Sequence, residues 1–338
     1  MQVSMKKIAE IAGCTPQAVS SVFKNNSTTR VSESLRRQVL HVAQELGYVP
    51  NQLSAALRRK RTGMIALILP WDIPEAMDII NLEAAKAGYR VLSLFTHAPD
   101  SSREIEALDA VLAWQVDGLI WLPYAEPDAC QKQIEHFRER SLPIVFLQRR
   151  LEAVPGDFIG TDYRSGIECA VRHLQEQGYS EIFYLLLKSS FALRQERKQY
   201  FHEITGGKGT VIEVTTPADA AEFNSLLQRS CGVLCDDFPG VEFIHAALDA
   251  GVSIPGQIGV VMIGDHRLGA STCISCLMHP KMTSVRQEYH IQSRMAVECL
   301  IRRIRDKTIP YENILLPMKF TVRGSTVHKP TKKERYKK

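Results

Sequence analysis

The sequence predicts an α/β protein that carries a separate, all-helical domain at its N-terminus. Two observations predict this. The first 50 residues hold three short amphipathic helical patterns. From residue 64 onward, apolar runs alternate with helical patterns, which is typical of parallel sheets with helices on both faces. The chain has 338 residues and is therefore long enough for two or more domains with their own cores.

The first predicted helix lies close to the N-terminus. Ile8, Ile11 and Ala12 share one helical face and are expected to pack inward. Gly13 ends the helix, because a left-handed turn favours a residue without a Cβ. Thr15 then has the position of an N-cap for a second helix.

The second predicted helix starts at Pro16, since proline is favoured at the first helical position. It presents Gln17, Ala18 and Ser21 outward, while its apolar residues face the core. A helix whose first turn is small and polar suits the major groove of DNA, where the N-terminal residues touch base edges. An ordinary helical hairpin is the alternative interpretation.

A polar loop at residues 25–29 leads to the third predicted helix, which Ser32 caps. Gly47 ends that helix and Pro50 prevents its continuation. The apolar positions 35, 39, 42, 43 and 46 share its inner face. Three helices within about 50 residues match the size of a DNA-binding headpiece.

A short basic segment follows directly. Asn51 can cap a helix of about two turns, which is too short to be stable alone in water. Four consecutive cations at 58–61 suit both a helix C-terminus and DNA phosphates. We expect this short helix to form only on DNA, with Leu57 as an apolar wedge in the minor groove.

Charge is distributed unevenly along the chain. Residues 1–61 hold ten Lys and Arg against three Asp and Glu, and residues 329–338 hold six against one. The body between them therefore carries a net charge of −7, although the whole chain carries +5. A basic head on an acidic body indicates that an anionic polymer binds at one end. The basic tail at 329–338 is expected to be disordered.

Composition excludes several other classes of protein. The sequence shows neither an apolar run long enough to span a membrane nor the apolar core of a secretory signal. Its eight cysteines form no regular framework, and Cys273 and Cys276 lack a second pair with zinc-site spacing. We therefore expect reduced, partly buried thiols, no bound metal and no cofactor.

The body predicts two sets of four parallel strands, hence two doubly wound sheets with a ligand site where strands end. The predicted strands are 64–69, 90–95, 118–122, 143–147, 182–187, 210–214, 232–235 and 258–263. The predicted helices are 75–87, 103–115, 128–140, 164–177, 193–203, 218–229 and 241–250.

Nucleotide and catalytic motifs are missing from the body. No Gly-x-Gly-x-x-Gly, phosphate-binding loop or Gly-x-Ser-x-Gly motif occurs in a suitable context. The glycine-rich residues 206–209 precede a strand and not a helix, so a plain turn is the better interpretation. Asp236 and Asp237 could be an acid pair, but hydrogen bonding to ligand hydroxyls is the favoured interpretation.

The N-terminal motifs together resemble the lactose-repressor/galactose-repressor (LacI/GalR) family of bacterial transcriptional regulators. The resemblance rests on residues 8–13 (IAEIAG), 18–20 (AVS), 31–32 (VS), 46–51 (LGYVPN) and 57–58 (LR). One departure concerns Ser21, where the family usually has arginine. The resemblance implies a set of DNA-binding residues: Thr15, Pro16, Gln17, Ala18, Ser20, Ser21, Asn25, Asn51, Ser54, Leu57 and Arg58.

The resemblance continues more loosely through the body, at 116–120, 144–150, 173–178, 251–255 and 283–287. It implies a two-lobed, periplasmic-binding-protein-like (type I) domain in which the chain crosses between lobes three times. A helix at 286–305 returns to the first lobe, and residues 323–326 resemble the closing strand of the second. Residues 70–80 are shorter than the usual loop and helix there.

Effector-binding candidates follow from strand ends and from the resemblance: Trp71, Asp72, Gln148, Arg197, Asp236, Asp237 and Asp265. Arg197 matches a family arginine that anchors a ligand hydroxyl or carboxylate. Gln148 stands where the family often has aspartate, and Gly264 stands where it usually has the first of two acids.

The expected organisation is a helix-turn-helix domain at 1–50, a hinge helix at 51–62, an effector-binding and dimerisation domain at 63–328 and the tail at 329–338. The first lobe spans about 63–162 and 286–320, and the second about 163–285 and 321–328.

We therefore expect a cytoplasmic, homodimeric repressor that binds a palindromic operator, is controlled by a sugar-like effector, and is neither an enzyme nor a membrane protein. The alternatives are a small-molecule binding protein of transport and an α/β enzyme. The headpiece argues against the first, and the missing catalytic groups argue against the second.

Overall fold

The computed structural model describes residues 3–24, 31–48, 61–97, 101–215, 220–265, 267–268 and 272–327. The chain divides into two units, Met1–Thr62 and Gly63–Lys338. Several expected features lie outside the described residues: the loop with Asn25, the tail, and the hinge positions Asn51, Ser54, Leu57 and Arg58.

In the described part of the first unit there are three helices, α1 (Met5–Ile11), α2 (Pro16–Lys24) and α3 (Glu33–Glu45). Their small core is built from Ile8, Ala9, Ala12, Val19, Val22, Val39, Val42 and Ala43. Ile11 does not join this core, contrary to the prediction, because its side chain is 48% exposed. The first helix therefore contributes Ile8, Ala9 and Ala12 to the core, while the side chain of Ile11 faces outward.

The helix starts and stops follow local chemistry. The Thr15 hydroxyl accepts a hydrogen bond from the backbone N–H of Ala18 at 3.2 Å, and Ser32 accepts one from Leu35 at 3.3 Å. Gly13 at φ 60° ends the first helix, and Gly47 at φ 59° ends the third. These caps fix where α2 begins and therefore which side chains lie in its first turn.

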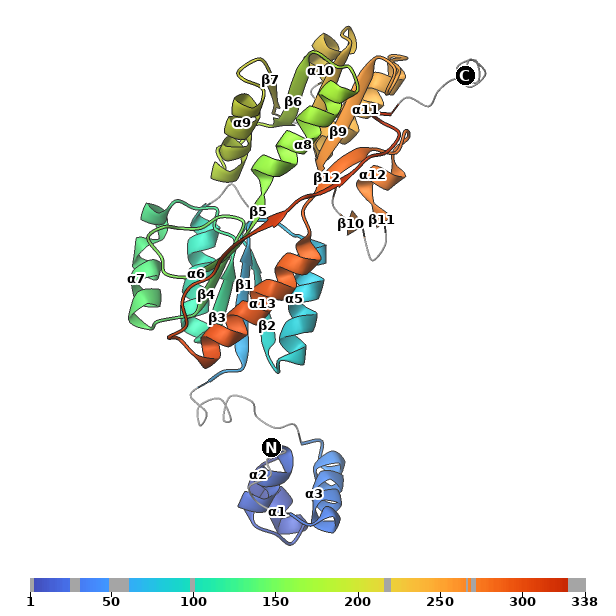
Figure 1. Cartoon of the computed structure of the whole chain (residues 1–338). Coiled ribbons are helices and arrows are strands. Elements are labelled where there is room, and N and C mark those ends of the chain that lie inside the picture. The colour runs from blue at the N-terminus through green and yellow to red at the C-terminus, as the bar shows by residue number, and fades with distance from the viewer. Residues whose placement is uncertain are drawn as a thin grey trace. The chain divides into compact units, whose positions relative to one another are not determined.

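The second unit is built on two six-stranded sheets (Figure 1). The first sheet is parallel throughout and has the order β13-β5-β4-β3-β1-β2. Its strands are β1 (Met64–Leu69), β2 (Arg90–Phe95), β3 (Gly118–Trp121), β4 (Ile144–Leu147), β5 (Asp157–Asp162) and β13 (Asn313–Pro317). We call this sheet with its helices the first lobe.

The second sheet has the order β14-β12-β9-β8-β6-β7, and only its edge strand β14 is antiparallel. Its strands are β6 (Ile182–Leu187), β7 (Thr210–Val214), β8 (Cys231–Asp236), β9 (Ile258–Gly264), β12 (Thr283–Arg286) and β14 (Lys319–Thr321). We call this sheet with its helices the second lobe, which also carries the small hairpin of β10 (Arg267–Leu268) and β11 (Thr272–Cys273).

The predicted eight strands are present, and four more extend the two sheets. The prediction of a closing strand at 323–326 is wrong. The closing strand is β14 (Lys319–Thr321), and residues 324–326 form a turn after it. The prediction missed β14 because it has only three residues, none of them fully buried. A strand at a sheet edge lacks the strong apolar pattern of a central strand.

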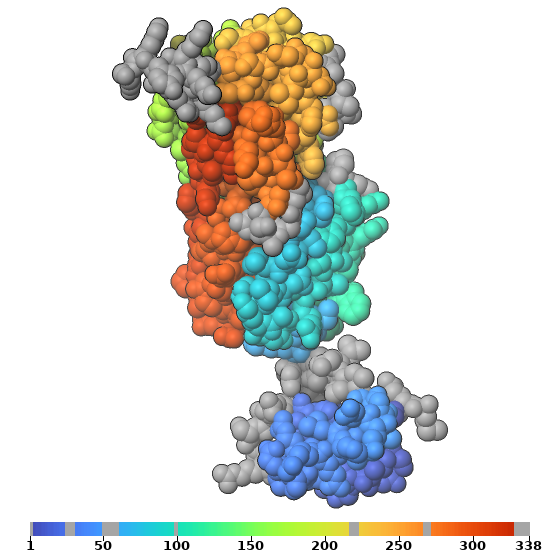
Figure 2. Space-filling view, turned by 90° about the vertical axis from the view of Figure 1, so that its right-hand side faces the viewer, coloured from blue at the N-terminus to red at the C-terminus, as the bar shows by residue number. Residues whose placement is uncertain are grey.

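Helices cover both faces of each sheet. In the first lobe, α5 (Pro74–Lys86) and α13 (Tyr289–Arg305) pack on one face and α6 (Ser101–Trp114) and α7 (Gln131–Glu139) on the other. The short helix η1 (Pro127–Cys130) precedes α7. Figure 2 shows orange α13 beside blue and cyan α5, although more than 200 residues separate them in sequence.

In the second lobe, α8 (Tyr163–Glu176) and α9 (Ala192–Ile204) cover one face of the sheet. The other face is covered by α10 (Ala220–Leu227) and α11 (Asp237–Asp249), while α12 (Ile274–Leu277) follows the hairpin. Among the described residues, every helix is too short or too polar to span a bilayer.

The chain passes between the lobes three times: from β5 to α8, from β12 to α13, and from β13 to β14. The red β13–β14 segment in Figure 1 is the last of these crossings. Because Tyr163 and Tyr289 begin the helices after the first two crossings, both residues lie where the lobes meet. We call this region the interlobe site.

Candidate functional site

The first turn of α2 is open to solvent. Thr15, Pro16 and Gln17 are exposed, while Ala18 and Ser20 are half-buried. The half-buried Ser21 donates its hydroxyl to the carbonyl of Gln17 at 3.0 Å. Its hydroxyl is therefore engaged within the helix. Gln17 presents the free amide of this turn, and an amide can pair with an adenine edge.

A buried ion pair forms the centre of the interlobe site. Arg197 of α9 donates from Nη2 to Oδ2 of Asp236, at the end of β8, at 3.0 Å. The hydroxyl of Tyr184 donates to the other carboxylate oxygen, also at 3.0 Å. Arg194, one turn before Arg197, lies 3.8 Å from the same carboxylate. The sequence-predicted residues Arg197 and Asp236 therefore contact each other directly.

Arg197 keeps one polar atom without a partner. Its guanidinium lies over the ring of Tyr163 at 5.4 Å, and its Nε is buried without a hydrogen bond. Burial alone lowers the pKa of this guanidinium, but Asp236 and the neighbouring phenols raise it above its usual range. A permanently charged group with an unused buried donor can bind an acceptor on a ligand.

Asp237 and Asp265 are joined through the backbone. The N–H of Asp265 donates to Oδ1 of Asp237 at 2.6 Å. Gly264, directly before Asp265, has φ 115°, and a Cβ there would lie 2.5 Å from the Asp237 carboxylate. The absence of a side chain at 264 therefore allows this close approach.

The Asp265 carboxylate is already occupied within the protein. It accepts hydrogen bonds from the N–H and hydroxyl of Ser275 at 2.9 and 2.7 Å and from the Ser284 hydroxyl at 2.8 Å. Arg323 lies 3.8 Å away. Asp265 is thus a positioning residue for Asp237 and its neighbours, and its carboxylate is committed to the protein.

The first lobe contributes two amides. Gln148 follows β4 at φ 60° and donates to the Gln292 side chain of α13 at 3.0 Å. Gln292 in turn donates to the carbonyl of Ile159 at 3.1 Å. The Gln148 Oε1 is buried without a partner, as is Oε1 of Gln287, whose amide donates to the Tyr163 hydroxyl.

Aromatic rings from both lobes meet and belong to the same core cluster as Tyr163 and Tyr289. Phe191, in the turn before α9, stacks on Tyr124 at 5.0 Å and contacts Trp71 edge-on at 5.5 Å. The buried Glu104 fixes the Tyr124 loop, because it accepts hydrogen bonds from two backbone N–H groups of that loop and from Trp121. Asp72, next to Trp71, is exposed.

The phenols of the site remain neutral. Burial raises the pKa of Tyr163, and it raises those of Tyr184 and Tyr289 well above the usual value. Neutral phenols donate and accept hydrogen bonds but do not act as bases near neutral pH. The arrangement is suited to holding a polar ligand by hydrogen bonds and ring contacts.

Two family models match the chain. Residues 4–51 match the model described as bacterial regulatory proteins, lacI family, and residues 171–326 match the periplasmic binding protein-like domain. The chain belongs to the lacI family. It is a DNA-binding transcriptional regulator with an effector-binding domain, and not an enzyme.

Relatives align with this lacI-family chain over nearly their full length. The HTH-type transcriptional regulator DegA of Bacillus subtilis is 26% identical, with 96% of this chain and 98% of DegA covered. Catabolite control protein A of Priestia megaterium is 23% identical, with 96% and 100% covered.

Solved structures show the same fold. The lac repressor dimer bound to operator and the anti-inducer ONPF has a TM-score of 0.82 at 21% identity, with 97% of this chain and 100% of that chain covered. A LacI family regulator from Enterococcus faecalis with bound ribose has a TM-score of 0.66 at 18% identity, with 78% and 98% covered.

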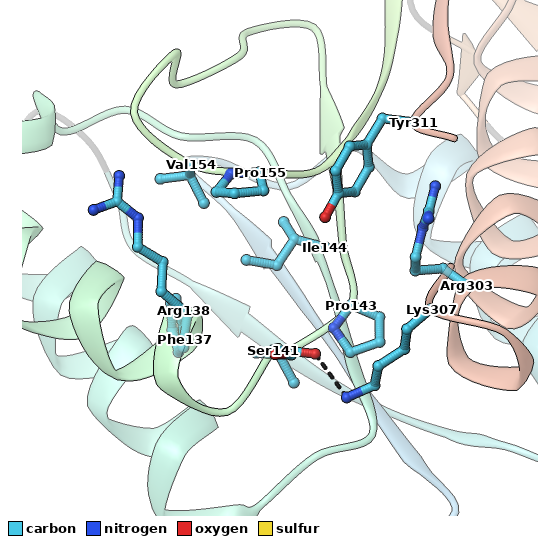
Figure 3. A pocket seen from close by; sticks show the side chains of 11 residues that line it. Phe137, Arg138, Ser141, Pro143, Ile144, Val154, Pro155, Arg303, Lys307 and Tyr311 are labelled. Atoms are coloured by element: carbon cyan, nitrogen blue, oxygen red, sulfur yellow. Dashed lines mark hydrogen bonds between the residues drawn. The ribbon is translucent and has the colours of Figure 1, made fainter. Parts of the chain in front are cut away.

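A hollow of about 280 Å³ lies elsewhere in the first lobe of this lacI-family protein (Figure 3). It is at the other end of the strands, since Ile144 begins β4 whereas Gln148 follows its end. Lys307 and Ser141 both line it, and Lys307 donates a hydrogen bond to the carbonyl of Ser141 at 2.7 Å, drawn as the dashed line in Figure 3. This hollow is therefore separate from the interlobe site.

Sequence reasoning missed several residues that complete the interlobe site. These are Tyr124, Tyr163, Tyr184, Phe191, Tyr289, Gln287 and Gln292. Tyr163 directly follows β5, so assigning that strand would have pointed to it. Tyr289 and Gln292 lie on α13, whose return to the first lobe the resemblance implied. Which of its residues face the site depends on contacts with distant segments, such as those of Gln292 with Gln148 and Ile159.

Proposed function

We propose that this lacI-family regulator is a repressor that binds a palindromic operator as a homodimer and is controlled by a sugar or sugar derivative. The observation that carries the effector part is the interlobe cluster around Arg197. There, Arg197 Nε and Gln287 Oε1 are buried without partners, and both residues contact Tyr163. Hydroxyl groups can satisfy those atoms, and sugar rings stack well on aromatic faces.

The charge balance favours a neutral ligand. Arg197 is already paired with Asp236, and the next residue in the chain, Asp237, is a second buried carboxylate. An anionic ligand would meet these carboxylates, whereas a polyhydroxylated ligand would donate to them. Solved relatives that carry ribose, cellobiose or D-xylulofuranose add support to this choice.

The DNA part rests on the exposed first turn of α2 and on the basic N-terminal residues. Two copies related by a twofold axis would place two such helices on two half-sites of a palindrome. The organisation that we propose keeps the headpiece at 1–50, the hinge at 51–62 and the effector and dimerisation domain at 63–328. The site of action is the bacterial cytoplasm, on the nucleoid.

The effector controls operator binding through a coupling free energy between the interlobe site and the hinge. An effector that binds one arrangement of the lobes more tightly shifts the population towards that arrangement. In a dimer this shift changes the spacing of the two hinge segments and hence operator affinity. The free energy that is transmitted equals the differential affinity of the effector for the two arrangements.

Genomic binding-site mapping with the full-length protein tests the proposal. We expect a small number of palindromic sites next to genes for sugar uptake or breakdown, and increased transcription of those genes on deletion. Isothermal calorimetry with the corresponding sugars then tests the effector. Reduced transcription on deletion would overturn the repressor role, and failure of all pathway sugars to bind would overturn the effector class. A measured molecular mass equal to that of one chain, under operator-binding conditions, would overturn the proposal of a homodimer.

A further inference from the structure

Cys273 and Cys276 form a close thiol pair that effector binding and DNA binding leave unused. Their sulfur atoms lie 2.8 Å apart, and both residues are half-buried. Cys273 is the N-cap residue of α12, and Cys276 lies within that helix. To form a disulfide, the two sulfur atoms would need to approach by roughly 0.8 Å.

The surroundings of the pair suit oxidation chemistry. Cys276 has a lowered pKa, first because Cys273 hydrogen-bonds to it, with Ser275 and the Arg323 charge adding to the effect. The pKa of Cys273 is raised, first by burial and then by its hydrogen bond to Cys276. Cys276 is thus the better thiolate, and Cys273, whose sulfur lies 2.8 Å away, is placed to resolve a sulfenic acid on it.

One of the two residues between the cysteines, Ser275, holds Asp265. The buried Ser275 donates its N–H and its hydroxyl to the two oxygens of the Asp265 carboxylate. The backbone N–H of Asp265 donates to Asp237, as described above. A covalent link between positions 273 and 276 would therefore act on the helical turn that fixes these two aspartates.

We propose that Cys273 and Cys276 are a redox-sensing pair that a hydroperoxide converts to a disulfide, and that the change reaches Asp237 through Ser275 and Asp265. The redox step goes beyond the proposed function and does not depend on it. Only an effect of the disulfide on effector affinity would rest on the proposed function, because it requires Asp237 to contact the effector.

The chemistry proceeds in two steps. The Cys276 thiolate attacks one oxygen of the hydroperoxide, whose O–O bond breaks, so that an alcohol (or water, from hydrogen peroxide) leaves and Cys276 becomes a sulfenic acid. The Cys273 sulfur then attacks the Cys276 sulfur, the S–O bond breaks and water leaves. Two electrons pass from the two thiols to the peroxide, and a dithiol reductant reverses the change.

The test uses the reduced, full-length protein and hydrogen peroxide. Peptide mass mapping should show a 273–276 disulfide that dithiothreitol reverses. Cys273→Ser should stop at a sulfenic acid on Cys276 that dimedone traps, and Cys276→Ser should form neither product. Cys169→Ser is the matched control, because Cys169 is also half-buried, and it should behave like wild type. Two intact thiols after peroxide treatment, or equally fast dimedone labelling of Cys169, would overturn the redox step.

Transmission to Asp237 is measured separately and without an effector. Amide hydrogen exchange at Asp265 should be at least threefold faster in the oxidised protein than in the reduced protein. The reason is that the hydrogen bond from the Asp265 N–H to Asp237 is weakened by the disulfide. The Cys273→Ser/Cys276→Ser double variant should show no change with peroxide. Equal exchange at Asp265 in oxidised and reduced wild type would overturn transmission, whatever the outcome for sugars.

Discussion

Arg197 and Asp236 form a buried ion pair across two elements of the second lobe, with Nη2 and Oδ2 3.0 Å apart. Each residue is only 8% exposed. The pair uses one edge of the guanidinium and leaves Nε without a partner. A paired and fixed guanidinium presents its remaining donors in a set direction, so an incoming ligand meets a preorganised group.

Replacing Arg197 should affect both stability and effector binding. Arg197→Ala leaves the Asp236 charge buried with Tyr184 and Arg194 as its neighbours, and breaking such a pair costs about 3–5 kcal/mol. We also expect effector affinity to fall at least tenfold. Urea unfolding and calorimetry with the cognate sugar measure the two effects.

The matched control for that experiment is Arg194→Ala. Arg194 is more exposed and lies 3.8 Å from the same carboxylate, so its loss should cost much less stability. Operator affinity without effector should stay close to wild type in both variants, because the headpiece is unchanged. Unchanged sugar affinity in a folded Arg197→Ala protein would remove Arg197 from the site.

The sequence predicted the central strands well, because they depend on local patterns. Buried central strands such as β8 are continuously apolar, and Asp236 stands at the end of that strand. Arg197 was proposed from the family resemblance, through its spacing to Phe201. The edge strand β14 was misplaced because half-exposed strands lack that pattern.

The missed site residues depend on long-range contacts. Phe191 meets Tyr124 and Trp71 only because the two lobes come together. Asp265 was expected to face the ligand from its place after β9, but its carboxylate is held by Ser275 and other protein groups. Position along a strand places a residue at the right edge of a sheet, whereas its hydrogen-bond partners are set by distant segments.

Adding one methyl group at Gly264 should disturb Asp237. Gly264→Ala would place a Cβ 2.5 Å from the Asp237 carboxylate, at a φ of 115° that alanine rarely adopts. Backbone strain alone costs about 1–3 kcal/mol, and displacement of Asp237 should weaken sugar binding as well. Thermal unfolding and calorimetry measure these two effects.

Gly178→Ala separates strain from contact in that experiment. Gly178 also has a positive φ, 92°, but a Cβ there would meet nothing within 4 Å. It should lose stability while keeping wild-type sugar affinity. If Gly264→Ala binds sugar as tightly as Gly178→Ala does, then the position of Asp237 does not matter for binding.

The buried pair of Arg303 and Asp157 should be a main support of the first lobe. Asp157 is fully buried and accepts hydrogen bonds from Arg303 at 3.1 and 2.8 Å and from the Glu312 N–H at 2.8 Å. Asp157→Asn removes the charge that balances the guanidinium and should cost about 3–5 kcal/mol in urea unfolding.

Glu181→Gln is the matched control for Asp157→Asn. It removes one partner of the exposed pair that Glu181 forms with Arg229, which is expected to contribute about 0–1 kcal/mol. If both variants lose the same small amount of stability, then the Arg303–Asp157 pair does not hold α13 to the first sheet.

Gln17 should read sequence and not merely attract DNA. It is exposed in the first turn of α2, where Thr15 caps the helix, and its amide can pair bidentately with adenine. Gln17→Ala should therefore cost about 1–3 kcal/mol on a selected operator and little on random DNA. The operator is first selected from a random duplex pool with full-length protein, and both affinities are then measured at one salt concentration.

Lys7→Ala is the control: Lys7 pairs with Glu10 on the exposed side of α1, and its loss should change both affinities slightly and equally. An equal loss on operator and random DNA in Gln17→Ala would show that Gln17 does not contact a base edge.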